Sequence, residues 1–201
     1  MDFQFGHLNL SNLPCIRDNK NLLLDMNMKS HSSIIKATVR DCTLLEGIGK
    51  VSFLEAHGNS APEEVVTEYV NKNYNESVLA AQLSNPDNIY HLIYHIGMAA
   101  GYSKMMYATE QIAIPLPNVT KLERLYLLKD FYGLGLGLEL LNYNIELSKK
   151  MNQAGMWLFV WKENHRAINF YNKAGFKITG SHDFKLSETH SNPNHLMFLN
   201  Y

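Results

Sequence analysis

Three glycines at alternate positions, Gly133, Gly135 and Gly137, stand immediately before a run rich in helix-forming residues. Glycine adopts backbone conformations that other residues avoid, and it lets a ligand approach the main chain closely. The first turn of a helix also leaves N–H groups unpaired and carries the positive end of the helix dipole. Together these features predict a site for an anion, most simply a phosphate. A tight strand-to-helix turn without a ligand is the alternative.

The spacing of these glycines does not fit the two common phosphate-binding motifs. A dinucleotide fingerprint needs Gly-x-Gly-x-x-Gly early in a βαβ unit, whereas Leu138 occupies the third glycine position here, two-thirds of the way along the chain. A P-loop ends in Gly-Lys-Ser/Thr, and that ending is absent. The glycines alone therefore predict an anion site without identifying its ligand.

Length, composition and charge narrow the class of protein. The chain has 201 residues, enough for one domain with a substantial core. A hydrophobic content of 46% and a charged content of 18% are typical of a globular protein. The formal charge of −1 lacks the basic excess of a nucleic-acid binder. No apolar stretch reaches the roughly 18–20 residues of a membrane span. We therefore expect neither nucleic acid nor membrane as a partner.

Cysteine and histidine positions suggest no metal or disulfide framework. Cys15 and Cys42 are the two cysteines, and their spacing fits neither zinc nor a disulfide scaffold. His182, His190 and His195 do not have a metal-ligand spacing either. With no basic region and apolar core at the N-terminus, a cytoplasmic protein without a metal is the simplest expectation.

The pattern of hydrophobic residues predicts one α/β domain with a mixed sheet at residues 34–201, preceded by an Asn- and Ser-rich N-terminal extension, 1–33, that we expect to be poorly ordered. After the glycine turn, a helix carries an apolar stripe at Leu136, Leu140, Tyr143, Leu147 and Met151. The expected strands are 34–39, 89–95, 98–107, 121–128, 156–161, 176–186 and 195–200. The other expected helices are 41–55, 63–73, 75–83 and one from the N-cap Asn164 to the C-cap Gly175.

A second motif follows the glycine turn at a defined distance. The segment "WLFVWKENHRAINFYNKAGF", 157–176, places a strand before Asn-x-x-Ala-x-x-Phe-Tyr-x-Lys-x-Gly-Phe. Strand, glycine turn, helix, strand and this second helix, in that order, resemble the GCN5-related N-acetyltransferase (GNAT) superfamily over residues 34–201. The stretches "LERLYLLKDFYGLGLG" and "GSHDF" are most similar to the branch of bacterial spermidine/spermine N-acetyltransferases.

This resemblance implies a fold and a co-substrate. The fold is a mostly antiparallel, twisted mixed sheet flanked by helices, with acetyl-CoA between two splayed central strands. The pyrophosphate would meet the N–H groups of 133–138, and the pantetheine arm would pair with the backbone around Leu125 and Leu127. Asn164 would either contact the coenzyme or only cap its helix. The implied coenzyme-binding residues are Leu125, Tyr126, Leu127, Gly133, Leu134, Gly135, Leu136, Gly137, Leu138, Asn164 and Tyr171.

One residue of the turn departs from the family pattern. The family usually has Gln or Arg where this chain has Tyr132. A phenol offers neither a guanidinium nor an amide to phosphate, although its hydroxyl is still a donor. We therefore expect, at worst, weaker binding of the coenzyme rather than its loss.

The resemblance also implies direct attack of an amine on the acetyl thioester in a ternary complex. The departing thiolate needs a proton, and Tyr171 matches the family tyrosine that supplies it; packing in the core is the alternative for its ring. Glu123 lies beside the expected thioester and could accept the amine proton, or it could simply pair with a neighbouring Lys or Arg. His57 is a second candidate base.

The acceptor is predicted from charge. Residues 41–76 hold seven acidic and two basic residues, which gives this segment a formal charge of −5. Such a segment would attract a polycation such as spermidine. The alternative is that these charges only form the solvated faces of two helices. The run "SETHSNPNHLMF" differs from the acidic stretch that the polyamine branch would have there.

A small-molecule primary amine is the leading hypothesis for the acceptor. A protein lysine or N-terminal acetyltransferase and a non-catalytic acyl-CoA sensor are the alternatives, and the family suggests a homodimer.

Overall fold

The computed structural model describes residues 31–201, and Ser32–Tyr201 form one compact unit. All but the last three residues of the expected extension, 1–33, lie outside the described residues. The first strand begins at Ser32, two residues earlier than the pattern suggests. Within residues 31–201, no helix is both long and apolar enough to cross a membrane.

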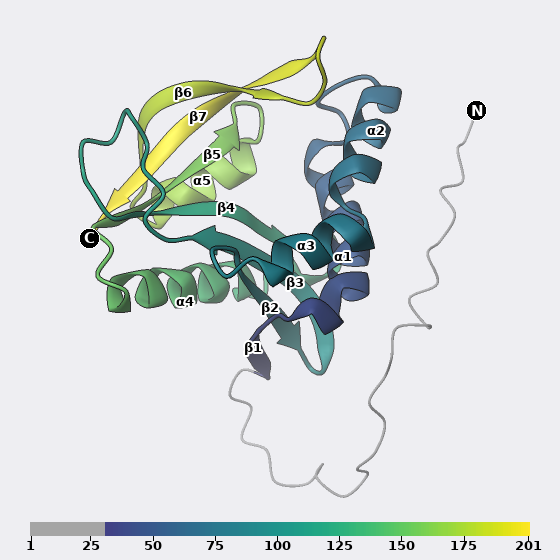
Figure 1. Ribbon diagram of the computed structural model, residues 1–201, viewed down its shortest axis with the longest axis horizontal. Helices are drawn as coiled ribbons and strands as arrows, with labels where there is room; N and C mark the ends of the chain where they lie inside the picture. Colours follow the sequence, from purple (N-terminus) through teal and green to yellow (C-terminus); the bar gives the residue numbers. More distant parts are fainter. Residues whose placement is uncertain (1–30) are drawn as a thin grey trace, which may run out of the picture. The chain divides into compact units, whose positions relative to one another are not determined.

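Seven strands form a single sheet with the order β1-β2-β3-β4-β5-β7-β6 (Figure 1). The bounds are β1 Ser32–Lys36, β2 Ile89–His95, β3 Met98–Met106, β4 Val119–Leu127, β5 Gly155–Trp161, β6 Lys177–Lys185 and β7 Ser191–Asn200. Every neighbouring pair is antiparallel except β4 and β5, which are parallel. This confirms the mixed, mostly antiparallel sheet, and β6 and β7 form the expected closing hairpin.

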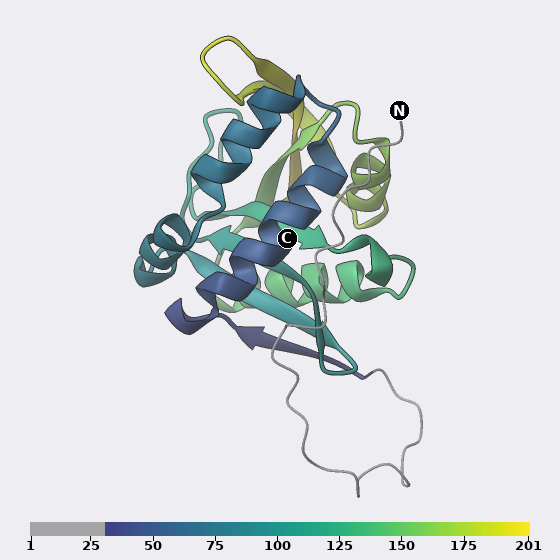
Figure 2. The same ribbon diagram turned by 90° about the vertical axis from the view of Figure 1, so that its right-hand side faces the viewer.

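Helices cover both faces of the sheet. Their bounds are α1 Cys42–His57, α2 Glu63–Asn73, α3 Glu76–Ser84, α4 Leu136–Lys150 and α5 His165–Lys173. Figure 2 looks onto α1, α2 and α3, with α4 passing behind strands of the sheet and α5 at the right-hand side of the view. The helices form one layer on each face of the sheet. Two consecutive buried residues of β2 contact different layers: Leu92 packs with Leu45 of α1, and Ile93 packs with Leu140 of α4. Successive side chains of a strand point to opposite faces, so both layers are anchored on the same strands.

The parallel pair β4–β5 separates soon after it begins. Only three residue pairs join the two strands, from Val119 with Gly155 to Lys121 with Trp157. Beyond Lys121 the ribbons diverge (Figure 1). The sheet is therefore open on one side of β4 from Leu122 onward, although β3 pairs with the other side as far as Leu127.

The stripe that the sequence predicts on α4 is only partly the buried face. Leu136 and Leu140 are buried, whereas Tyr143 and Met151 are 37% and 54% exposed. The buried face instead continues through Leu141, Asn144, Ile145 and Ser148. Two of these are polar but paired: Asn144 accepts a hydrogen bond from Ser103, and the Ser148 hydroxyl lies 2.6 Å from that of Thr120. A pattern search for apolar residues misses such paired polar positions.

Buried His91 predicts a loss of stability in acid. It is 3% exposed on β2, and burial lowers its pKa from 6.5 to about 4. The unfolded chain takes up a proton near pH 6.5, whereas the folded chain does so only near pH 4. The free energy of unfolding should therefore fall as the pH falls from 6.5 to 4, by up to roughly 3 kcal/mol for this residue. Urea unfolding at several pH values measures the slope.

His91→Gln should flatten that slope, and His165→Gln, at a residue that is mostly exposed, serves as the control. An unchanged slope in His91→Gln would show that His91 takes up its proton equally well in both states.

Candidate active site

The space between the diverging strands is a cavity of about 100 Å³, here called the inner cavity. Its walls come from 122–127 of β4, 158–161 of β5, the start of α5 and the end of α1. Eight residues singled out from the sequence line it: His57, Glu123, Leu125, Tyr126, Leu127, Tyr132, Asn164 and Tyr171. The structure thus brings together residues that are up to 114 positions apart in the chain.

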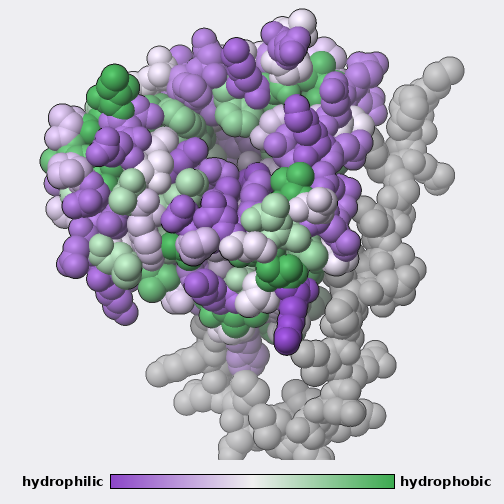
Figure 3. All heavy atoms as spheres, in the orientation of Figure 1, coloured by the Kyte–Doolittle hydropathy of each residue, from purple (hydrophilic) through white to green (hydrophobic). Residues whose placement is uncertain are grey.

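A second cavity of about 320 Å³, here called the outer cavity, lies against the first. It is bounded by α1, α2, β4, β5 and the β6–β7 hairpin, and it appears as a hollow in the face shown in Figure 3. The two cavities share a wall made of His57, Leu122, Glu123, Arg124, Tyr126, Phe159 and Trp161. Two ligands could therefore meet at this wall, one from each cavity.

A β-bulge in β4 shapes the shared wall. Lys104 of β3 pairs with Arg124, and the next residue, Met105, pairs with Leu122, so Glu123 is an extra residue without a partner on β3. In a regular strand the side chains of Glu123 and Arg124 would point to opposite faces. Bulges change side-chain direction and are common beside active sites. Here both side chains line both cavities.

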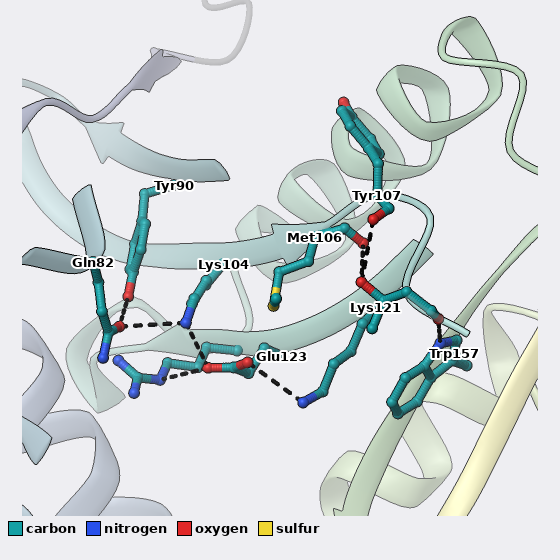
Figure 4. A network of polar contacts seen from close by, with 10 residues as sticks. Gln82, Tyr90, Lys104, Met106, Tyr107, Lys121, Glu123 and Trp157 are labelled. Carbon is teal, nitrogen blue, oxygen red and sulfur yellow. Dashed lines mark hydrogen bonds and ion pairs between the residues drawn. The ribbon is translucent and has the colours of Figure 1, made fainter. Parts of the chain in front are cut away.

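The carboxylate of Glu123 is held by cations. Its oxygens lie 2.8 Å from Nζ of Lys104 and 3.4 Å from Nζ of Lys121, as Figure 4 shows, and 4.0 Å from Nε of Arg124. Burial alone would raise the pKa of Glu123, but the three cations together outweigh burial and lower this pKa. Glu123 is therefore ionised and is a weak proton acceptor. The predicted ion pair with a neighbouring Lys or Arg is confirmed, and Glu123 also lines the cavities, so its role as a base stays a prediction.

His57 lies at the end of α1 among aromatic rings. Its ring centroid is 4.9 Å from that of Phe53, 5.9 Å from Trp161 and 6.3 Å from Tyr126. Burial lowers the pKa of His57 from 6.5 to about 4, so the imidazole is neutral at pH 7. His57 lines both cavities, so its position is compatible with the role of a second candidate base.

Tyr171 is both part of the core and part of the cavity wall. Its ring packs edge-on against Phe170 and Phe176, with centroids 5.1 and 5.5 Å away. Burial raises the pKa of Tyr171 well above its ordinary value near 10, so the phenol keeps its proton at neutral pH. The two interpretations of this residue are therefore compatible.

Both ends of α5 are capped, which fixes the position of Tyr171. At the start, the Asn164 side chain accepts a hydrogen bond from the Ala167 N–H at 3.1 Å, so the predicted cap is confirmed. At the end, Gly175 has φ +98°, Phe176 N–H donates to the Tyr171 carbonyl, and Gly175 N–H donates to that of Asn172. This pair of bonds is a Schellman motif, with glycine at C′, one residue past the terminal Ala174.

The glycine turn has the conformation that its composition predicts. Gly133 and Gly135 have φ of +81° and +79°, which L-residues with side chains rarely adopt. The N–H groups of Leu138 and Glu139 both donate to the Gly135 carbonyl. Within residues 31–201, the N–H groups of 133–137 donate to no backbone carbonyl. Residues 133–138 do not themselves line the inner cavity, but the adjacent Tyr132 does.

Tyr132 contacts Arg166, a residue that sequence reasoning missed. The guanidinium of Arg166 lies 3.8 Å from the centroid of the Tyr132 ring, and its Nη2 donates to the Tyr132 hydroxyl at 2.8 Å. Arg166 belongs to the first turn of α5 and also lines the inner cavity. A cation therefore stands beside the glycine turn, although it comes from another helix.

Leu122, Arg124, Phe159 and Trp161 are the residues of the shared wall that sequence reasoning missed. In a regular strand Arg124 would lie on the opposite face from Glu123, and the bulge that brings the two side chains to one wall has no signature in the sequence. Trp161 ends β5, is partly exposed and lines both cavities.

Comparison with known proteins agrees with this geometry. The model of the acetyltransferase (GNAT) family matches residues 53–176, which is more than half of the chain. The chain belongs to the GNAT acetyltransferase family. This acetyltransferase is similar to an uncharacterized N-acetyltransferase of Lactobacillus delbrueckii subsp. lactis, 28% identical over 155 residues that cover 77% of this chain and 90% of that one. It is also similar to one from Mycobacterium bovis, 29% identical over 66% of this chain and 80% of that one.

Solved structures support the same fold for this acetyltransferase. The PaiA N-acetyltransferase of Thermoplasma acidophilum, solved with coenzyme A, has a TM-score of 0.68 at 21% identity and covers 85% of this chain and 99% of its own. The ribosomal-protein-S18-alanine N-acetyltransferase of Escherichia coli has a TM-score of 0.61 at 17% identity, covering 84% and 93%. The GNAT fold expected from the motifs is therefore confirmed.

Two glycines of this acetyltransferase should respond oppositely to alanine. Gly135→Ala forces a side chain into φ +79°, which should reduce the free energy of unfolding by about 1–2 kcal/mol. Gly137 has an ordinary helical position, and a Cβ there would lie 3.4 Å from the Leu127 side chain. Gly137→Ala should therefore be neutral or stabilising by up to about 1 kcal/mol. Urea unfolding of the two variants tests this, and equal losses would contradict it.

Proposed function

We propose that this protein transfers the acetyl group of acetyl-CoA to the primary amine of a small molecule, by direct attack within a ternary complex. The observation that carries the proposal is the pair of cavities with one shared wall, because it offers a place for each substrate. Neither cavity has a serine or cysteine among the described residues that line it. Direct transfer is therefore favoured over an acyl-enzyme on such a side chain.

In this proposal acetyl-CoA occupies the inner cavity. The open edge of β4 offers unpaired backbone groups to the pantetheine arm around Leu125 and Leu127, which would add to the sheet like a strand. The pyrophosphate would lie on the free N–H groups of the glycine turn, at the positive end of α4. The coenzyme A in the Thermoplasma acidophilum structure supports this assignment by analogy of fold.

In this scheme Arg166 supplies the phosphate-binding donors that the family usually has as Gln or Arg at the position of Tyr132. A guanidinium binds phosphate oxygens through two parallel donors. Stacking on Tyr132 restricts Arg166 to the side of the inner cavity that adjoins the turn. From the family resemblance, Tyr132 was expected at worst to weaken binding of the coenzyme. In this proposal the ring of Tyr132 instead supports the arginine that binds the phosphate.

The reacting amine must lose a proton before it attacks. Glu123 and neutral His57 both have lowered pKa values, so neither is a strong base. The shared wall carries a buried arginine, and both burial and a nearby positive charge lower the pKa of an ammonium group. We propose that the acceptor amine loses its proton mainly through this environment, with Glu123 or His57 passing the proton on through water.

The proposed acid is Tyr171. The tetrahedral intermediate collapses by breaking the C–S bond, and the departing thiolate takes the phenolic proton. Main-chain N–H groups on the open edge of β4 are the candidate donors to the oxyanion.

The polyamine form of the proposal depends on acidic residues outside the two cavities. Glu63, Glu64 and Glu68 line a shallow groove on α2, and among the described residues Glu123 is the single acidic residue that lines either cavity. The acceptor in this proposal is therefore a small primary amine, because a polyamine such as spermidine would find little acidic surface inside the cavities. Cytoplasmic location and a homodimer are carried over from the sequence as part of the proposal.

Release of free CoA thiol from acetyl-CoA tests the reaction. Purified protein is offered polyamines, amino acids and lysine peptides, and acceptor-dependent release is expected with a free amine. Release with peptides alone would favour the protein acetyltransferase. Tight binding of acetyl-CoA without release across the panel would favour the non-catalytic sensor.

Tyr171→Phe should lower kcat by about 10²–10⁴-fold, since it removes the proton donor. The affinity for acetyl-CoA, measured by calorimetry, should change little because the ring and its packing remain. In the parent enzyme, burial raises the pKa of this phenol, so kcat should not decline through its ionisation below about pH 10. Tyr143→Phe, at a half-exposed residue of α4, is the control; similar kcat in both variants would remove Tyr171 from the mechanism.

Arg166→Ala should raise the Kd for acetyl-CoA about tenfold, since a charge-assisted contact to phosphate is lost. The difference should shrink at high salt. Arg166→Lys should lie between, and Tyr132→Phe should show a smaller effect because the stacking ring remains. Lys173→Ala, an exposed cation at the other end of α5, is the matched control. Unchanged binding in Arg166→Ala would place the pyrophosphate elsewhere.

A further inference from the structure

We infer that the acceptor carries a carboxylate beside its amine and that Arg124 binds this carboxylate in the outer cavity. The inference rests on the proposed function and specifies its acceptor. The observation behind it is a buried arginine that lines the outer cavity and whose Nη1 atom has no hydrogen-bond partner within residues 31–201.

Arg124 is 9% exposed, and its Nη1 atom is completely buried without a hydrogen-bond partner within residues 31–201. The guanidinium carbon lies 4.7 Å above the ring of Tyr74, which supports the side chain from one side. A guanidinium keeps its charge at every relevant pH, and a buried charge without full pairing is costly. Such a group is expected to have a partner when the protein works.

Glu123 does not fill this role. Its carboxylate is already bound by Lys104 at 2.8 Å and lies 4.0 Å from Nε of Arg124. Three cations share this one carboxylate. Among the residues that line the outer cavity, Lys121 and Arg124 face Glu123 alone, which leaves a formal charge of +1. A monoanion neutralises this excess, whereas a polycation would add to it.

The charge and the geometry select a carboxylate. A phosphate monoester carries close to two negative charges at pH 7, but a carboxylate carries one, and its two oxygens match the parallel donors of a guanidinium. Arg124 and Glu123 are neighbours, and both line the shared wall where the amine must meet the thioester. The amine and the carboxylate of the acceptor should therefore be only a few bonds apart.

One part of the remaining cavity wall is suited to an apolar side chain, whereas Asn192 and Asn194 line another part. Phe53, Tyr69 and Phe184 contribute aromatic surface opposite the polar wall, with ring centroids of neighbouring pairs 5.0 and 5.7 Å apart. A volume of about 320 Å³ is at the small end of the range for small-molecule sites, roughly 300–1,000 Å³. The chemical class that fits is a free amino acid with an apolar or aromatic side chain.

The step balances without a further reactant. The neutral α-amine attacks the thioester carbonyl, the C–N bond forms and the C–S bond breaks. One proton leaves the amine nitrogen, and one proton joins the thiolate to give free coenzyme A. The carboxylate takes no part in bond making; it holds the amine at the shared wall.

Matched pairs of amines provide the test. L-phenylalanine is compared with phenethylamine, and L-leucine with isoamylamine, so that each pair differs only in the carboxylate. Thiol release with the purified chain should show a kcat/KM about 10–100-fold higher for each amino acid. Arg124→Gln should abolish this preference by raising KM for the amino acids alone. Any loss of kcat caused by the missing positive charge should be the same for both members of a pair.

Arg124→Lys should recover part of the preference, since it keeps the charge but loses the two-pronged donor. Lys150→Gln, at an exposed residue of α4, is the control for a lost surface charge. Because Arg124 is buried, each variant is first checked for its melting temperature and its affinity for acetyl-CoA. Equal loss of activity toward amines with and without a carboxylate would overturn the inference.

Binding separates failure of the inference from failure of the proposed function. L-phenylalanine is titrated into the protein saturated with coenzyme A, in the parent and in Arg124→Gln. Binding that depends on Arg124 supports the inference even if no thiol is released. Absence of thiol release would instead contradict the proposed acetyl transfer. Turnover of spermidine or of plain amines in preference to amino acids overturns the inference and leaves the transfer standing. No binding and no turnover of any carboxylate also overturn it.

Discussion

The whole site depends on the separation of two strands that begin as a pair. After three residue pairs, β4 and β5 diverge, and a sheet that is opened in this way leaves backbone groups without partners. The divergence is tolerated because apolar side chains fill the space beneath it: Leu122, Leu158, Val160 and Tyr171 belong to one core cluster with residues of α4 and β7. The unpaired edge is thus the natural place for a ligand with amide groups of its own.

Electrostatics at the shared wall follow from the bulge at Glu123. By placing two consecutive side chains on one side, the bulge sets Glu123 beside Arg124, while Lys104 and Lys121 reach the same carboxylate from β3 and β4. The carboxylate is stabilised in its charged form and is correspondingly less basic. A site of this kind favours an amine that arrives with little charge of its own, or with a negative group that offsets the excess. It is a poor environment for a molecule with several ammonium groups.

Much of the fold could be read from the chain, because its signals are local. Gly133 and Gly135 adopt positive φ, Asn164 caps its helix, and the strand and helix boundaries agree with the patterns to within a few residues. Long-range geometry could not be read. Asn144 is not part of the apolar stripe predicted for α4, yet it is buried and paired, and Arg124 lines the site because of a bulge that nothing in the sequence marks. The stacking of Arg166 on Tyr132 joins two elements 34 residues apart, and no spacing rule reveals it.

The two arginines of the site are supported in the same physical way. At the glycine turn, the usual cation or amide is replaced by an aromatic ring, and a guanidinium from α5 rests on that ring. At the shared wall, another guanidinium lies above the ring of Tyr74. An aromatic face supports a guanidinium without using its N–H donors, since the attraction acts through the π-face. Arg166 donates one bond from Nη2 to the Tyr132 hydroxyl and keeps its other donors for an oxyanion, and Nη1 of Arg124 has no partner within residues 31–201. The oxyanion is a phosphate in one proposal and a carboxylate in the other. An arginine paired with a protein carboxylate would have its donors occupied, so the aromatic support is what makes both residues suitable for binding substrates rather than only stabilising the fold.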